Sequence, residues 1–254
     1  MAKEDSVQGE LLNRLAHYGR VYLLEKVKST NDYAFTLAEQ KEPAIVVAHR
    51  QTKGRGRFRR RWFADENSLI FSVLFFPKPG FTGAGLITHI AGLALCRAIE
   101  QAAGVKEPMP LLRWPNDVII RDKKVAGVLS EQRRDAVVVG IGVNVNQTGM
   151  PENLPDAGSL YLAYGKGFDR FVLLDLFLPE FFQMVNEVYK GNVKEIWEEI
   201  KKRSSILHQR VEIRTLLRKY IGTVIDIDDE GKVVLRTDAG RLVVFNAGQV
   251  RRLR

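Results

Sequence analysis

The sequence predicts an α+β domain over residues 1–206, followed by a compact all-β domain over residues 207–254. The first observation behind this prediction is a mixture of short apolar, strand-like segments and longer amphipathic, helical segments up to about residue 202. The second is a change of texture near residue 207, after which five short alternating segments fill the rest of the chain. Short alternating strands separated by glycine-containing turns are typical of a small β-barrel.

The individual elements follow from hydrophobic periodicity and turn residues. Strands of the first domain are predicted at residues 21–27, 44–49, 69–76, 111–114, 118–120, 125–131 and 137–145. Helices are predicted at residues 5–19, 33–40, 87–103, 169–189 and 194–202, the second of them entered through capping side chains at 29–32. The last five strands are predicted at residues 209–213, 220–227, 232–237, 241–246 and 249–253. The near-continuous apolar character of 137–145 favours a central position in its sheet.

Composition bounds the compartment and the partners. The 254-residue chain has one cysteine, Cys96, in an apolar helical segment, so the thiol is predicted to be buried and inert. The N-terminus lacks an apolar signal-peptide core, and no uncharged apolar run reaches the length of a bilayer span. A cytoplasmic protein without a membrane segment is therefore expected. The formal charge of +9 favours acidic partners, which leaves nucleic acid, nucleotide and an acidic protein substrate open.

Several common site types have no sequence signal. The four histidines lie far apart without an i, i+4 pair, so no zinc motif is present. The chain has no phosphate loop of the Gly-x-x-x-x-Gly-Lys-Ser/Thr type, and Gly54-Arg-Gly56 lacks the third glycine of a dinucleotide fingerprint. No metal-ligating residues are predicted.

The segment Gln51–Trp62 is the densest candidate for a binding site. It contains five arginines and two glycines in a run short enough to be one loop between two strands. Glycine allows the backbone to approach a ligand closely, and arginine binds carboxylate or phosphate in a bidentate manner. The segment therefore predicts a loop that closes over an anion, with Trp62 as a flat stacking surface. A solvated basic loop is the alternative that the segment alone leaves open.

Three further segments carry groups that suit ligand binding. Ser29-Thr30-Asn31 places short polar side chains at a strand-to-helix junction, where an ordinary helix cap is the alternative. Arg113-Trp-Pro-Asn-Asp117 combines a cation, an aromatic ring, a rigid turn and two hydrogen-bonding side chains. The third combines Lys124–Glu131, which contains Gly127, with Gly140–Asn146, where glycines would let a flat ligand approach the backbone of a strand.

Taken in order, these motifs resemble those of the biotin protein ligases, enzymes that attach biotin to carboxylase carrier domains. The resemblance covers most of residues 21–160 and the closing β domain, including Gly158-Ser-Leu160 and Phe245–Val250. It implies a mixed central sheet flanked by helices, of the class II synthetase-like biotin–lipoyl ligase fold, with an SH3-like C-terminal barrel. It also implies two reactions in one pocket. Biotin and ATP give biotinyl-5′-AMP and pyrophosphate, and biotin is then transferred to a lysine of the biotin carboxyl-carrier protein, with Mg²⁺ accompanying the nucleotide.

The resemblance also implies the site residues. The implied biotin site consists of Ser29, Thr30, Asn31, Gln51, Gly54, Arg55, Gly56, Arg57, Arg113 and Gly127. The implied ATP and adenylate site consists of Arg55, Arg57, Trp62, Asn116, Lys124 and Asn144, and the catalytic residues would be Arg113 and Arg55. Arg113 replaces the usual lysine of the family, which excludes general acid or base catalysis there but keeps charge stabilisation. Two other departures, Lys53 and Arg59, replace a common alanine and a common glycine of the loop.

Two competing functions and several partner predictions accompany this interpretation. A lipoate or octanoate ligase would share the catalytic fold, but the Gln51–Trp62 loop and the β domain favour biotin. A nucleic-acid-binding protein would use the arginine loop as its basic patch, yet the loop lacks interleaved aromatic residues beyond Phe58 and Trp62. About twenty residues precede the first strand, too few for a helix-turn-helix domain, so a ligase-only form without DNA binding is expected. Homodimers are common in the family, so a homodimer is a further expectation.

Overall fold

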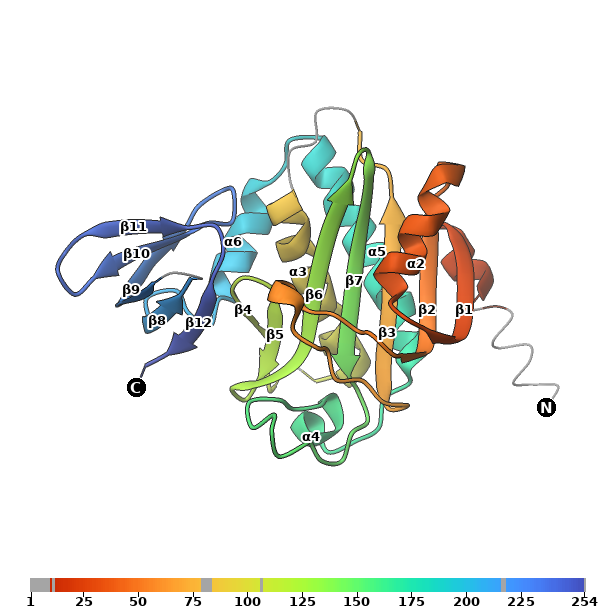
Figure 1. Cartoon of the computed structure of the whole chain (residues 1–254), viewed down its shortest axis with the longest axis horizontal. Helices are drawn as coiled ribbons and strands as arrows, with labels where there is room; N and C mark the ends of the chain where they lie inside the picture. Colours follow the sequence, from red (N-terminus) through yellow and green to blue (C-terminus); the bar gives the residue numbers. More distant parts are fainter. Residues whose placement is uncertain (1–9, 11, 79–83, 106, 216–217, 254) are drawn as a thin grey trace.

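The main sheet of the protein has seven strands in the order β1-β2-β3-β7-β6-β5-β4 (Figure 1). The structure is a computed structural model that describes residues 10, 12–78, 84–105, 107–215 and 218–253. The strands are β1 (Arg20–Val27), β2 (Ala44–Gln51), β3 (Ser68–Phe75), β4 (Leu111–Arg113), β5 (Asp117–Ile120), β6 (Lys123–Arg133) and β7 (Ala136–Asn144). Only β1 and β2 pair in parallel, and every other pair is antiparallel, so the sheet is mixed as expected.

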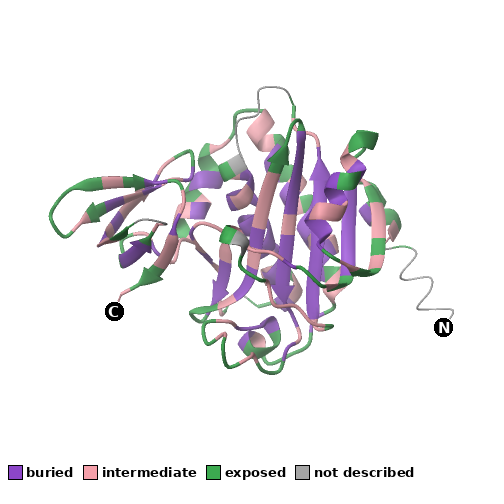
Figure 2. Cartoon of the chain, in the orientation of Figure 1, coloured by how far each residue is buried: buried purple, intermediate pink, exposed green. Residues whose placement is uncertain are grey.

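The centre of the sheet is formed by β3 and β7. They pair in register from Ser68 opposite Asn144 to Phe75 opposite Val137. Nearly all their residues are buried, because both faces of these strands are covered (Figure 2). Strands buried on both faces read as continuous apolar runs, which is why the sequence predicted the central position of residues 137–145 correctly.

Helices cover the two faces of the sheet unequally. One face packs against α3 (Ala84–Ala103) and α5 (Arg170–Tyr189), with α6 (Lys194–Lys202) beside α3, and contains the large core. The other face is covered by α2 (Thr30–Leu37) and the short η1 (Ala38–Gln40) only over β2, β3 and β7. On that face the chain between β2 and β3, with η2 (Arg57–Arg59), crosses in front of β6 and β7 (Figure 1). This crossing segment is the predicted arginine loop.

The C-terminal strands form a second, antiparallel sheet in the order β11-β10-β9-β8-β12. They are β8 (Arg210–Arg214), β9 (Lys219–Ile227), β10 (Val233–Thr237), β11 (Leu242–Phe245) and β12 (Gln249–Arg252), which confirms the predicted strands within two residues. Their buried apolar side chains belong to the same continuous core as those of α3 and α6, so the second sheet packs against these helices.

Most of the predicted helices are confirmed, with two qualifications. Of the helix predicted at 5–19, residues 10 and 12–16 are helical, while 1–9 and 11 lie outside the described residues. A short helix, α4 (Leu160–Tyr164), was missed.

Cys96 is fully buried on α3, and burial raises the pKa of its thiol to about 12, as expected for an inert cysteine. In the described part of the chain, no helix has both the length and the apolar character needed to cross a membrane.

His89 gives the fold a pH dependence. It lies on α3 against the ring of Trp197, with 5.5 Å between ring centroids. The pKa of His89 is lowered to about 4, mainly because its side chain is buried. A hydrogen bond to the Gly231 backbone raises this pKa in part, and the positive charge of Arg57 lowers it. The unfolded chain therefore binds a proton at higher pH than the folded chain does, so the free energy of unfolding falls as the pH drops.

We expect the free energy of unfolding to decrease by up to about 3 kcal/mol between about pH 6.5 and about pH 4, and not to change further on account of His89 below that. Urea unfolding at several pH values measures this dependence. His89→Gln should flatten the profile, whereas His17→Gln, at an exposed position, should leave it unchanged. An unchanged profile in His89→Gln would contradict the assignment.

Candidate active site

A cavity of about 1230 Å³ lies between the arginine loop, the uncovered face of the main sheet and the C-terminal strands. Every predicted site residue except Gly54 lines it. These residues are Ser29, Thr30, Asn31, Gln51, Arg55, Gly56, Arg57, Trp62, Arg113, Asn116, Lys124, Gly127 and Asn144. Residues from segments far apart in the sequence therefore converge on a single site.

Gly54 differs from the other predicted residues because it does not line the cavity. It is a buried residue of the loop, and its carbonyl accepts a hydrogen bond of 3.0 Å from the backbone of Trp62. A Cβ at this position would lie 3.2 Å from Nε2 of Gln51 and 3.3 Å from the carbonyl oxygen of Trp62. The small size of Gly54 therefore allows the two ends of the loop to come together.

One end of the cavity is polar and uncharged. Ser29 caps α2 by accepting a hydrogen bond from the backbone of Asp32. Oε1 of Gln51 accepts hydrogen bonds from the backbone of Thr30 at 2.8 Å and from its hydroxyl at 3.2 Å. The hydroxyl of Ser72 on β3 lies 2.7 Å from that of Thr30. The predicted helix cap and the predicted binding residues are thus the same residues.

Asn31 supports this polar end from below. Its Oδ1 accepts a hydrogen bond of 2.7 Å from Ser72, and its Nδ2 donates to Oε2 of Glu131 at 2.8 Å and to the carbonyl of Leu129 at 3.2 Å. A Cβ on Gly140 would lie only 2.0 Å from that Oδ1, so β7 needs glycine here to leave room for the amide. Because its amide is already satisfied by protein groups, Asn31 fixes the positions of its neighbours.

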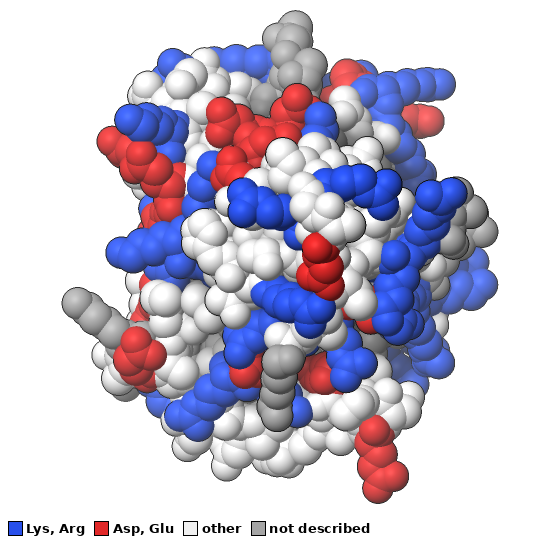
Figure 3. Space-filling model, turned by 90° about the vertical axis from the view of Figure 1, so that its left-hand side faces the viewer, with Lys and Arg blue, Asp and Glu red and all other residues white. Residues whose placement is uncertain are grey.

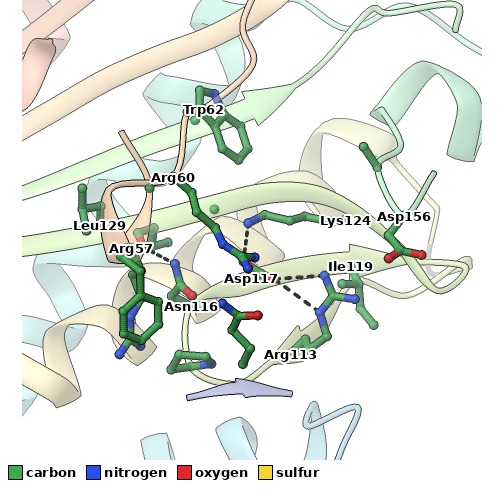
Figure 4. A pocket seen from close by; sticks show the side chains of 18 of the residues that line it. Arg57, Arg60, Trp62, Arg113, Asn116, Asp117, Ile119, Lys124, Leu129 and Asp156 are labelled. Atoms are coloured by element: carbon green, nitrogen blue, oxygen red, sulfur yellow. Dashed lines mark hydrogen bonds and ion pairs between the residues drawn. The ribbon is translucent and has the colours of Figure 1, made fainter. Parts of the chain in front are cut away.

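A cluster of two cations on one carboxylate lies at the floor of the cavity (Figure 4). Asp117 accepts hydrogen bonds from Nη2 of Arg113 at 3.0 Å and from Nε at 3.3 Å, and Nζ of Lys124 lies 2.5 Å from its other oxygen. All three side chains are less than 30 % exposed, so their interactions are only partly screened by water. The cluster carries a net positive charge. The site prediction omitted Asp117, although it ends a motif that the sequence had singled out.

The loop arginines have two different environments. Both Nη atoms of Arg55 donate to Asp32 at 2.8 Å, and Glu131 lies 3.5 Å away; the hydrogen bond to Asp32 raises the pKa of Arg55. Burial lowers the pKa of Arg57, which the charge of Asp117 partly offsets, and its guanidinium lies over the ring of Phe58. Arg57 is thus a partly desolvated cation in the same cavity as the cluster, whereas Arg55 is neutralised beside α2. The side chain of Arg59 lies outside the described residues.

Trp62 lies flat against two glycines of the sheet. A Cβ on Gly142 would be 2.5 Å from Nε1 of its indole, and one on Gly127 would be 3.2 Å from Cζ3. Nζ of Lys124 lies 5.2 Å from a ring centroid of Trp62, within the range of a cation–π interaction. The indole N–H is buried without a hydrogen-bond partner in the part of the chain that the structure describes. Trp62 therefore offers a flat apolar surface, and its indole N–H is turned against the sheet.

The two asparagines of the predicted adenylate site contact backbone groups. Nδ2 of Asn116 donates to the carbonyl of Val128 at 2.7 Å, which ties the turn before β5 to β6. Nδ2 of Asn144 donates to the carbonyl of Gly158 at 2.9 Å. Its Oδ1 is buried with no partner among the described residues, although buried polar atoms are normally hydrogen-bonded. Oδ1 of Asn144 is thus an unpaired acceptor on a residue that lines the cavity.

The sequence did not predict that the second sheet would contribute to the cavity. The second sheet contributes Glu212, Arg214, Arg251 and Arg252 to the lining of the cavity. Lining residues from the rest of the chain were also not predicted, among them Arg60, Arg61, Asp122 and Asp156. Arg252 lies 3.8 Å from Asp122 and so connects the two sheets. Basic side chains dominate the right-hand edge of Figure 3, the side that corresponds to the front of Figure 1. On short alternating strands such charges cannot be distinguished from a solvated face, so no sequence pattern indicated that they line a cavity.

The described residues contain no group of three or more His, Cys, Asp or Glu side chains arranged to hold a metal ion. The carboxylate within the cation cluster, Asp117, is already paired with Arg113 and Lys124.

Two family models match the chain. Residues 23–147 match the biotin/lipoate A/B protein ligase family, and residues 206–251 match the biotin protein ligase C-terminal domain. The biotin–[acetyl-CoA-carboxylase] ligase of Mycobacterium tuberculosis is 30% identical over 99% of this chain and 96% of its own length. The bifunctional ligase/repressor BirA of Bacillus subtilis is 32% identical over 87% of this chain and 70% of its own length.

A solved structure has a similar overall fold. The biotin protein ligase from Aquifex aeolicus, in complex with biotin and ATP, superposes with a TM-score of 0.81 at 32% identity, over 92% of this chain and 99% of that one. The chain therefore belongs to the biotin protein ligases, within the biotin/lipoate A/B protein ligase family.

Proposed function

We propose that the protein is an ATP-dependent biotin–protein ligase that forms biotinyl-5′-AMP and transfers biotin to a lysine of a carboxylase biotin carrier domain. The observation that carries this proposal is the composition of the cavity beneath the arginine loop. An uncharged polar end at Ser29–Thr30 and Gln51 lies in the same cavity as the cation cluster of Arg113, Asp117 and Lys124. Biotin has matching ends, a polar ureido ring and a carboxylate.

In the first step a carboxylate oxygen of biotin attacks the α-phosphorus of ATP, and the bond to pyrophosphate breaks. Both reactants are anions, so they need fixed cations to approach each other. Asp117 already holds Arg113 and Lys124 in place. The two cations therefore lose little conformational freedom when they bind the carboxylate of biotin and the α-phosphate of ATP. Arg57, partly desolvated, adds positive charge to the same cavity, and its electrostatic effect is larger there than in water. The guanidinium of Arg113 stabilises charge without giving up a proton.

In the second step the lysine amine of the acceptor attacks the acyl carbon of biotinyl-5′-AMP. The bond to AMP breaks, the amide forms, and the amine loses a proton to solvent or to AMP. On the nucleotide side, Trp62 supplies a flat surface and Asn144 an unpaired acceptor. Mg²⁺ would enter with the phosphates of ATP, which it binds in preference to all-protein cages.

The direct test is release of pyrophosphate from ATP in the presence of biotin, compared with lipoate and octanoate. Biotin should support release, and a carrier domain added afterwards should gain the mass of one biotin at its acceptor lysine. A carrier domain with that lysine changed to arginine is the control and should gain nothing. Release with lipoate but not with biotin would refute the proposal and favour the lipoate-ligase alternative.

Several finer predictions rest on the sequence and on the family. They are a catalytic domain over residues 1–206 with the β domain over 207–254, a homodimer, a cytoplasmic location and the absence of DNA binding. A gel-shift assay with duplex DNA, in the presence of biotin and ATP, tests the last of these. Sedimentation of the biotin-saturated protein tests the dimer.

A further inference from the structure

We propose that Trp114 is a positioning residue, through which the C-terminal sheet holds the Arg113–Asp117 segment in register for adenylation. This inference rests on the proposed function and assigns a role to a residue whose indole is buried and bonded to the C-terminal sheet. Trp114 stands between Arg113, whose guanidinium reaches the cation cluster, and the turn that leads to Asp117.

The strand that carries Arg113 is held by the chain leading into the second sheet. The backbone N–H of Leu112 donates to the carbonyl of Arg203 at 2.8 Å, and that of Ser205 donates to the carbonyl of Leu112 at 2.9 Å. These bonds add residues 203–205 to the outer edge of β4, which is the last strand of the main sheet. A three-residue edge strand has few hydrogen bonds of its own, so this attachment is a large part of what fixes it.

The indole of Trp114 provides the second attachment. It is 3% exposed, and its Nε1 donates a buried hydrogen bond of 2.8 Å to the carbonyl of Gly231, in the turn between β9 and β10. From the turn between β11 and β12, a Cβ on Gly248 would lie 3.6 Å from Cζ3 of the same ring. Two turns of the second sheet therefore contact one side chain of the catalytic segment.

The turn that offers the Gly231 carbonyl is itself rigid. Gly231 has φ of +79°, and its N–H donates to the carbonyl of Asp228 at 2.8 Å. Oδ1 of Asp228 accepts from the backbone of Lys232 at 2.8 Å and of Glu230 at 3.0 Å. A Cβ on Gly231 would lie 2.7 Å from the ring of His89, so the turn is fixed against α3 as well. The Gly231 carbonyl, which accepts the hydrogen bond from Trp114, is thus held in place by contacts that do not involve the indole.

The consequence concerns the geometry of the reaction more than the binding of biotin. Small displacements of a group that orients the reacting atoms can lower the rate by orders of magnitude, because the attack requires close alignment. Arg113 and Asp117 flank Trp114, whereas Thr30 and Gln51 are held on α2 and β2 by a separate network. Loss of the Trp114 bond should therefore reduce the rate of adenylation and leave biotin affinity almost unchanged.

The chain offers a matched control for this test. Trp197 is also 3% exposed, and a Cβ on Gly231 would lie 3.3 Å from its Cη2, so it packs on the same turn. Its indole N–H, however, has no hydrogen-bond partner among the described residues. Trp114→Phe and Trp197→Phe therefore remove similar volumes beside one turn, but only the first removes a hydrogen bond.

We expect Trp114→Phe to lower kcat for biotin-dependent pyrophosphate release about tenfold, with the dissociation constant of biotin changed less than about twofold by calorimetry. Trp197→Phe should keep kcat within about twofold even if its melting temperature falls. Asp228→Ala, which loosens the turn without changing either tryptophan, should lower kcat in the same direction by a smaller factor. This variant, at a half-buried position in the turn, keeps the test decisive if Trp114→Phe fails to fold.

Equal kcat values per folded molecule in Trp114→Phe and Trp197→Phe, or an unchanged kcat in Asp228→Ala, would overturn the positioning role. Parallel losses of kcat and of biotin affinity in Trp114→Phe would overturn it too, since they would indicate general loosening of the site. These outcomes presuppose an active unsubstituted protein. If that protein releases no pyrophosphate with biotin, the proposed function fails, and the positioning role fails with it.

Discussion

Replacing Arg113 with alanine is expected to lower kcat/KM for biotin-dependent pyrophosphate release about a thousandfold. The guanidinium is one of two cations held on Asp117 at the floor of the cavity. Its removal takes away a preorganised charge where two anions must meet, and it leaves the carboxylate of Asp117 neutralised by Lys124 alone. The approach of the anions and the position of Lys124 should therefore suffer together. Pyrophosphate release under substrate-limited conditions measures the effect.

Two substitutions make this test specific to Arg113. Arg113→Lys restores a cation, though not the bidentate geometry, and should retain activity within about tenfold of the unsubstituted protein. Arg210→Ala breaks another arginine–aspartate pair, with Asp238 at 2.7 Å, on an exposed part of the second sheet that does not line the cavity. It should leave the rate unchanged. An alanine variant at Arg113 with more than a tenth of normal activity would show that another cation carries the stabilisation.

The fold could be predicted from the sequence to the extent that its elements are long and periodic. β7 was placed at the centre of the sheet because its apolar run is continuous, and α5 was found because its buried residues recur at helical spacing. α4 was missed because five residues capped by Ser159 are too short to show a period. The order of strands in the main sheet depends on long-range pairing that no local pattern encodes.

The candidate site could be predicted where its motifs are local in the sequence. It could not be predicted where it depends on which acidic side chain pairs with which basic side chain in the folded protein. The residue types of the Gln51–Trp62 loop indicated an anion site, and nearly all its predicted members line the cavity. The sequence could not show that Arg55 is bound to Asp32 on α2, since both charges are equally free in an extended chain. Asp117 was overlooked for a related reason. Its role as the bridge between Arg113 and Lys124 depends on the pairing of β5 with its neighbours β4 and β6.

Gly140 of β7 leaves the space that the side-chain amide of Asn31 occupies, and this leads to the second large prediction. Gly140→Ala is expected to weaken biotin binding about a hundredfold, with a smaller loss of folding stability. The new Cβ would lie 2.0 Å from Oδ1 of Asn31, closer than any non-bonded contact allows. Asn31 must then move, which breaks its hydrogen bonds with Ser72 and Glu131 and frees Thr30 from the arrangement that they support.

Gly149→Ala is the matched control, since a Cβ at that exposed glycine meets no atom within 4 Å. Calorimetric titration with biotin compares the two variants directly, and thermal unfolding shows whether each is folded at the temperature used. The second alanine should bind biotin as the unsubstituted protein does. If both bind equally well, the Asn31 network is not needed to shape the polar end of the cavity. If only Gly140→Ala is weakened while its fold persists, the glycine in this strand is required because the amide of Asn31 occupies the space in which its side chain would lie.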